Sequence, residues 1–144
     1  MKGIALRAER RLIYADSSAL VKLVIEETES VALQRHLEGA VVLATSRIAL
    51  VEVSRAAVLA NPHDAVRDEV ERLVAGCMLV AVSAQLLRAA RKLASSAVRT
   101  LDAIHLASAL RIDPDEFLAY DRRLLAAAAE HGLSIASPSP EATS

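Results

Sequence analysis

The stretch LIYAD at residues 12–16 runs from apolar side chains into a single aspartate, and FLAYD at residues 117–121 repeats the pattern. A helix-forming segment follows each aspartate directly. Short apolar runs of this kind are typical of strands buried in a parallel sheet whose faces are covered by helices. Because ligands collect at the carboxyl ends of such strands, we expect Asp16 and Asp121 to lie at that edge of the sheet.

The rest of the chain alternates in the same way between short and long segments. Runs rich in Val, Ile and Leu predict strands over residues 12–15, 41–44, 78–82, 117–120 and 133–136. Longer stretches rich in Ala and Leu predict helices over residues 18–26, 28–37, 46–60, 63–75, 84–94, 101–112 and 122–131. This alternation predicts an α/β fold with a mainly parallel central sheet of about five strands flanked by helices.

A length of 144 residues suits one domain. We expect this domain to span residues 1–136. The last residues, 137–144 (SPSPEATS), have the Pro and Ser content of a disordered tail.

Composition narrows the possible functions. Cys77 is the only cysteine, which predicts a reduced, cytoplasmic protein without disulfides or a cysteine-based zinc site. Aromatic residues make up 2% of the chain, which argues against nucleic-acid binding by base stacking. No uncharged run is long enough to cross a bilayer, so no membrane partner is expected. The net charge of −1 argues against a protein that coats DNA, because such proteins are strongly basic.

Two further carboxylates fall on apolar faces of predicted helices. With about 100° per residue, Glu52 shares its face with Ile48 and Ala56, and Asp102 shares its face with Leu106. A carboxylate is costly to bury unless another group or an ion balances its charge. Both positions therefore suggest a partner that the local sequence does not supply.

Each acid also has a local explanation, and these alternatives stay open. Asp16 and Asp121 are well placed to cap the helices that follow them. Glu52 could pair with Arg55, three residues further along its helix, or lie on the rim of the apolar face. Asp102 fits the first turn of a helix, where the helix dipole favours a negative charge.

Taken together, Asp16, Glu52, Asp102 and Asp121 are predicted to meet at one end of the sheet. At about 5 Å and an effective dielectric near 20, each like-charged pair would repel by roughly 3 kcal/mol. A divalent cation relieves this repulsion, and carboxylates without a His or Cys set favour Mg²⁺ or Mn²⁺ over zinc. Such ions activate water for attack on phosphate esters, so the predicted reaction is phosphodiester hydrolysis. The repulsion also predicts that Glu52→Gln raises the melting temperature of the metal-free protein.

The four acids lie within motifs that are informative as a set. These are DSSALVK at residues 16–22, SRIALVEV at 46–53, LDAIHLA at 101–107 and YDRRL at 120–124. In their order and spacing they resemble the PIN-domain ribonucleases, and most nearly the VapC toxins of bacterial toxin–antitoxin pairs. The resemblance covers residues from about 11 to 136.

The resemblance implies a metal-dependent endoribonuclease that cuts RNA, in which Asp16, Glu52, Asp102 and Asp121 are both the catalytic residues and the ligands of Mg²⁺ or Mn²⁺. It also implies a homodimer and a VapB-like antitoxin that wraps the dimer and reaches the active site. Many relatives carry Thr or Ser two residues before the last acid. Here that position is Ala119, so this hydroxyl group is missing.

Other polar residues near the acids are secondary candidates. Three basic residues would contact RNA phosphates without reading bases, or else belong to solvated helix faces. They are Lys22, Arg122 and Arg123. His105 lies three residues after Asp102 and would either pair with it or pack in the core.

Two other enzyme classes are excluded because this chain lacks residues that they require. A response-regulator receiver needs an aspartate after the third strand, where this chain has Ser83. A phosphatase with an aspartyl nucleophile needs a second aspartate two residues after Asp16, where this chain has Ser18. The alternative that remains is a non-catalytic module of the same fold that acts by binding an antitoxin, another partner or RNA.

Overall fold

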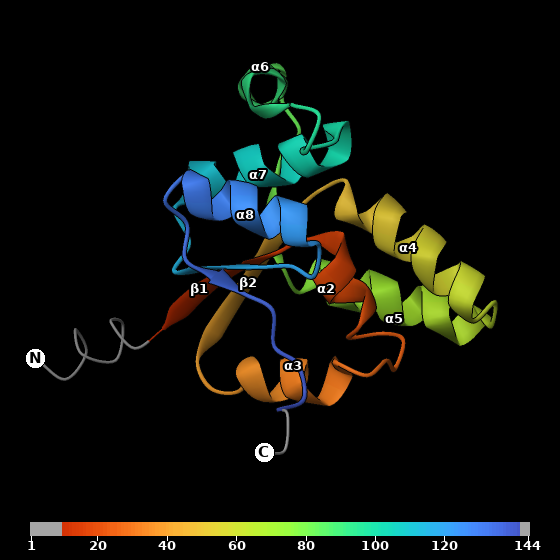
Figure 1. Ribbon diagram of the computed structural model, residues 1–144. Helices are drawn as coiled ribbons and strands as arrows, with labels where there is room; N and C mark the ends of the chain where they lie inside the picture. Colours follow the sequence, from red (N-terminus) through yellow and green to blue (C-terminus); the bar gives the residue numbers. More distant parts are fainter. Residues whose placement is uncertain (1–9, 142–144) are drawn as a thin grey trace, which may run out of the picture.

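The computed structural model describes residues 10–141, and in this part of the chain five strands form one all-parallel sheet (Figure 1). Their order across the sheet is β3-β2-β1-β4-β5. The strands are β1 (Arg11–Ala15), β2 (Val41–Ser46), β3 (Met78–Val80), β4 (Glu116–Leu118) and β5 (Ile135–Ala136).

Helices cover both faces of the sheet (Figure 1). On one face lie α2 (Ser17–Val21), α3 (Ser30–His36), α4 (Ala49–Ala60) and α5 (Asp64–Ala75). On the other face lie α7 (Thr100–Ile112) and α8 (Arg122–Glu130), and α6 (Ala84–Leu93) packs on α7. The prediction of a mainly parallel α/β sheet flanked by helices is confirmed. Within the described residues, no helix is both long and apolar enough to cross a membrane.

Alternating residues of β1 supply the two halves of the core. Ile13 and Ala15 face the layer of α2 to α5, whereas Tyr14 faces α7 and α8. Tyr14 is fully buried and stacks on Phe117 of the neighbouring strand, with ring centroids 5.6 Å apart. Most other core positions hold Ala, Leu, Val or Ile, as the low aromatic content requires.

The predicted first helix is shorter than its apolar pattern suggests. The pattern predicts a helix over residues 18–26, but α2 ends at Val21 and turns follow it. The hydroxyl group of Ser30 donates to the carbonyl of Lys22 at 2.7 Å and accepts from the backbone N–H of Glu27 at 2.8 Å. These side-chain bonds satisfy backbone groups that further helix would otherwise use.

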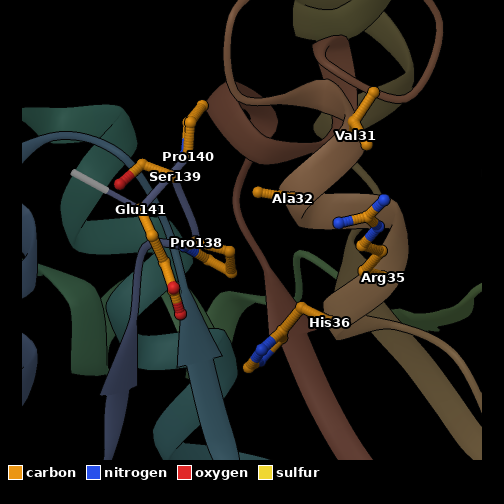
Figure 2. A pocket seen from close by; sticks show the side chains of 8 residues that line it. All are labelled: Val31, Ala32, Arg35, His36, Pro138, Ser139, Pro140 and Glu141. Carbon is orange, nitrogen blue, oxygen red and sulfur yellow. The ribbon is translucent and has the colours of Figure 1, made fainter. Parts of the chain in front are cut away.

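The C-terminal segment lies beside α3. The Tyr120 hydroxyl donates to the carbonyl of Pro138 at 2.6 Å. Figure 2 shows residues 138–141 facing Ala32 and His36 across a cavity of about 640 Å³. Residues 137–141 thus have defined positions, although the sequence predicts disorder for 137–144; residues 142–144 lie outside the described part of the chain.

The strand order reverses at β1. From this strand the chain proceeds to β2 and β3 on one side, while β4 and β5 lie on the other. Asp16 directly follows β1, and Asp121 follows β4, the neighbour with which β1 pairs. The carboxyl ends of these two strands form the topological switch point, the place where the strand order reverses. Open α/β sheets bind their ligands at this point.

Candidate active site

Asp16 is a buried carboxylate at the start of α2. It is 5% exposed, and its Oδ1 accepts hydrogen bonds from the Ser18 hydroxyl at 2.7 Å and the Ala19 backbone N–H at 3.1 Å. The predicted N-cap role is therefore confirmed, but capping does not compensate the charge. Burial raises the pKa of Asp16, and the negative charge of Asp102 adds to this effect.

Glu52 reaches the site from α4 and is held by Ser17 of α2 and His105 of α7. Its Oε1 accepts from the Ser17 hydroxyl at 2.6 Å and lies 2.7 Å from His105 Nε2. Within residues 10–141 it forms no ion pair with Arg55, so the predicted pair with Arg55 is wrong. Burial acts to raise the pKa of Glu52, but the bonds and charge of His105, together with Ser17, outweigh burial and lower that pKa.

Asp102 and Asp121 line one cavity of about 370 Å³ between α7 and α8. Asp121 caps α8 and accepts on Oδ1 from the backbone N–H groups of Arg123 at 2.8 Å and Leu124 at 3.2 Å. Burial raises the pKa of Asp102, and the neighbouring charge of Asp121 raises it further. The two acids therefore share one cavity, where the charge of Asp121 acts on Asp102.

Three of these carboxylates are anchored in the same way. The hydrogen bonds to Asp16, Glu52 and Asp121 within residues 10–141 all reach a single oxygen: Oδ1, Oε1 and Oδ1, respectively. The second oxygen of each group accepts no hydrogen bond in this part of the chain. A carboxylate held by one oxygen is oriented and still has a donor atom to offer to a cation.

The donor set fits a hard divalent cation by its chemistry. All four candidate ligands are carboxylates, the type of group that Mg²⁺ and Mn²⁺ prefer, and burial together with neighbouring negative charge raises the pKa of Asp16 and Asp102. As the side chains stand in residues 10–141, no three His, Cys, Asp or Glu groups are arranged to hold an ion. The carboxylates would therefore have to turn toward one another to bind one.

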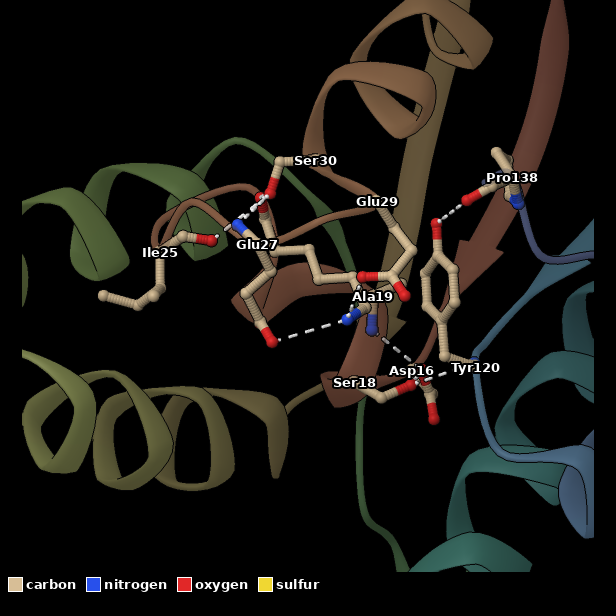
Figure 3. Close-up of polar contacts among 10 residues, drawn as sticks. Asp16, Ser18, Ala19, Ile25, Glu27, Glu29, Ser30, Tyr120 and Pro138 are labelled. Atoms are coloured by element: carbon tan, nitrogen blue, oxygen red, sulfur yellow. Dashed lines mark hydrogen bonds and ion pairs between the residues drawn. The ribbon is translucent and has the colours of Figure 1, made fainter. Parts of the chain in front are cut away.

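Lys22 belongs to a separate cluster on the outer side of Asp16. Its ammonium group lies 3.0 Å from Glu29, 3.6 Å from Glu27 and 4.8 Å from the centroid of the Tyr120 ring. Figure 3 shows both glutamates and Tyr120 near Asp16. With its side chain 11% exposed, Lys22 stabilises this cluster, and the prediction of a phosphate contact is not supported.

His105 has different partners from those that the sequence predicts. Its ring lies 2.7 Å from the Tyr14 hydroxyl through Nδ1 and bonds Glu52 through Nε2. The predicted pairing with Asp102 is absent among the hydrogen bonds of the described residues, although the charge of His105 lowers the pKa of Asp102. Sequence reasoning missed Tyr14, whose only signal is that a buried hydroxyl group needs a partner.

Sequence reasoning also missed Arg99. This residue precedes α7 and lines the cavity of Asp102 and Asp121 together with Arg122 and Arg123. We call these three the arginine rim. All three are exposed, and within residues 10–141 none forms a salt bridge. The larger cavity beside α3 is lined by other residues and holds none of the four acids.

A parallel α/β domain with acidic side chains gathered at its switch point belongs to a class that includes many phosphate-ester hydrolases. Residues 13–136 match the family model of the PIN domain, so this chain belongs to the PIN-domain family. The chain is similar to Ribonuclease VapC46 of Mycobacterium tuberculosis, with 40% identity over 129 residues that cover 88% of this chain and 98% of that protein. The predicted resemblance to the VapC group is thereby confirmed.

Two solved structures have a similar fold. VapC20 of Mycobacterium tuberculosis, a toxin that cleaves the sarcin–ricin loop, has a TM-score of 0.70 at 19% identity, and the match covers 88% of this chain and 99% of that one. A chain of a toxin–antitoxin complex from Klebsiella pneumoniae has a TM-score of 0.59 at 16% identity, with 76% and 86% covered. At these identities the two structures support the fold alone.

Proposed function

We propose that this chain is a metal-dependent endoribonuclease, the toxin of a VapBC-type toxin–antitoxin pair, and that it hydrolyses RNA phosphodiester bonds with a metal-activated water. The observation that carries the proposal is the set of carboxylates at the switch point, three of them anchored by one oxygen only. Membership of the PIN-domain family and the 40% identity to a protein named as a VapC ribonuclease support it.

In this proposal Asp16, Glu52, Asp102 and Asp121 hold Mg²⁺ or Mn²⁺ and form the catalytic centre. The bound ion would orient the phosphodiester, polarise a phosphate oxygen and lower the pKa of the attacking water. Burial raises the pKa of Asp16 and Asp102, and neighbouring carboxylates raise both further, so a bound cation would stabilise their ionised forms. Glu52 stays ionised at neutral pH because His105 and Ser17 stabilise its carboxylate.

The arginine rim is the proposed RNA contact beside the acids. Its three arginines line the same cavity as Asp102 and Asp121. Guanidinium groups bind phosphate oxygens in a bidentate geometry, which would place the RNA backbone over the carboxylates without reading bases. The predicted roles of Arg122 and Arg123 therefore stand as proposals, with Arg99 added.

The proposed partners are a VapB-like antitoxin and a second copy of this chain. The 40% identity to a protein named as a VapC ribonuclease and the similarity in fold to a chain of a toxin–antitoxin complex support the antitoxin partner. We also propose that the protein acts in the cytoplasm, where its RNA substrate would be found. In a non-catalytic module of the same fold, the acids would serve binding, and metal would not lead to cleavage.

Cleavage of RNA by the purified full chain tests the proposal. We expect cleavage with Mg²⁺ or Mn²⁺, none with EDTA, and loss of cleavage in Asp16→Asn and Asp102→Asn. The matched control is Asp68→Asn, which removes an exposed carboxylate of α5. Equal cleavage by wild type and Asp16→Asn would indicate a contaminating nuclease, and metal binding without cleavage would favour the binding module.

A further inference from the structure

A buried chain of hydrogen bonds links β1 to Glu52 through α7. The Tyr14 hydroxyl lies 2.7 Å from Nδ1 of His105, and Nε2 of the same ring lies 2.7 Å from Oε1 of Glu52. Tyr14 is 0% exposed and His105 is 2% exposed. Neither residue forms a hydrogen bond with Asp102 or Asp121 in the described residues, so Glu52 is the candidate ligand that this chain reaches, and Ser17 Oγ lies 3.3 Å from the same Nε2.

The partners determine where the hydrogens lie. An ionised carboxylate only accepts, so Nε2 of His105 must carry the hydrogen that points at Glu52. When the ring is neutral, Nδ1 is an acceptor, and the Tyr14 hydroxyl donates to it. Burial raises the pKa of Tyr14, so this hydroxyl group keeps its hydrogen at any physiological pH.

Packing holds Tyr14 in place. Its ring stacks on Phe117 with an interplanar angle of 5°, and it meets the His105 ring edge-on at 72° with centroids 5.9 Å apart. A rigid hydroxyl group on β1 therefore faces a buried ring on α7. An imidazole bonded at both nitrogens has one tautomer and one orientation.

We propose that Tyr14 and His105 are positioning residues for Glu52: the Tyr14 hydroxyl sets the His105 ring so that Nε2–H holds Oε1 and leaves Oε2 for the cation. This inference rests on the proposed function, because it assigns the second oxygen of Glu52 to the metal. Ser17 strengthens the same anchor, since its hydroxyl group donates to Oε1 at 2.6 Å. Loss of a group that orients a ligand typically weakens metal binding or activity by about 10-fold to 100-fold.

Tyr14→Phe in the full chain is the test, because it removes one hydroxyl group and keeps the stacked ring. Tyr120→Phe is the matched control: it also removes a hydrogen-bonded hydroxyl group, but that group donates to Pro138. Mn²⁺ binding is measured by calorimetry, and the His105 tautomer is measured from its ¹⁵N chemical shifts, assigned with His105→Gln. We expect Tyr14→Phe to weaken Mn²⁺ binding by about 10-fold or more and to remove the single Nε2–H tautomer, with no such changes in Tyr120→Phe.

Wild-type Mn²⁺ affinity together with an unchanged tautomer in Tyr14→Phe would overturn the inference and leave the proposed function intact. A wild-type chain that neither binds Mn²⁺ nor cleaves RNA would overturn both. The kinetic readout separates positioning from general loss of structure. A folded Tyr14→Phe protein should lose kcat and keep its KM for RNA, because the arginine rim is unchanged.

Discussion

Two amide substitutions in the acidic cluster should change stability in opposite directions. The sequence alone treats all four acids as repelling charges, so it predicts that Glu52→Gln stabilises the metal-free protein. The structure reverses that sign, because Glu52 accepts two hydrogen bonds whereas the charge of Asp16 is buried. We therefore expect Glu52→Gln to lower the melting temperature and Asp16→Asn to raise it.

The size of the Glu52→Gln effect follows from its two contacts. A hydrogen bond to a charged group contributes about 1.5–3 kcal/mol, roughly twice the contribution of a neutral one, so the two bonds lose about 1.5–3 kcal/mol together. Reduced repulsion with Asp102 offsets part of this loss, which leaves a net destabilisation of about 1–2 kcal/mol. For a chain of this size, that corresponds to a fall of about 3–6 °C.

Asp16→Asn acts in the other direction. The amide oxygen of asparagine can still accept from Ser18 and Ala19, and asparagine is a good N-cap residue. The substitution removes the buried charge whose burial raises the pKa of Asp16, so the folded state no longer carries that desolvation cost. The expected result is a rise of a few degrees.

Thermal unfolding in EDTA near neutral pH, followed by circular dichroism and calorimetry, measures both effects. The exposed Asp68→Asn serves as the control and should leave the melting temperature unchanged. If Glu52→Gln raised the melting temperature, or if Asp16→Asn lowered it, our reading of which acid is stabilised by the fold would be refuted.

Three further predictions concern pH, RNA binding and Lys22. The folded state binds the Asp16 proton more tightly than the unfolded state, so metal-free stability should fall as pH rises from about 4 through the raised pKa of Asp16. Melting curves in EDTA should show this slope in wild type and a weaker slope in Asp16→Asn. Alanine substitutions in the arginine rim should raise KM for RNA with little change in kcat, and each should reduce the salt dependence of binding by about one phosphate contact. A larger loss in kcat than in KM would contradict the rim's role. Lys22→Met should lower the melting temperature, because Glu29 and Glu27 lose their partner, and should leave KM for RNA unchanged. A raised KM would return Lys22 to the RNA interface.

The fold was predictable because its signals are local. Short apolar runs separated by amphipathic segments define a parallel sheet, and the aspartates that end two of them mark its functional edge. The error in the first helix has a non-local cause. Its apolar pattern continues to Ile25, but Ser30 bonds Lys22 and Glu27 and stabilises a turn there. Nothing in residues 18–26 indicates that competition.

The candidate acids could be chosen from the sequence for the same reason, since helix faces and strand ends are one-dimensional patterns. Their partners were not. The alignment of His105 with Tyr14 and Glu52 depends on how α7 and α4 pack on β1, which spacing along the chain does not determine. From the sequence, Lys22 is likewise expected to contact phosphate. In the structure its ammonium group instead contacts Glu27, Glu29 and the Tyr120 ring.

Anomalous diffraction at the manganese absorption edge, on crystals of the full chain grown with Mn²⁺, is the most direct measurement of the central claim. We predict a peak within coordination distance of Asp16 and Asp102, with Oε2 of Glu52 turned toward it, directly or through water. A manganese peak on other residues, or carboxylates that keep their metal-free positions with no peak between them, would contradict the account.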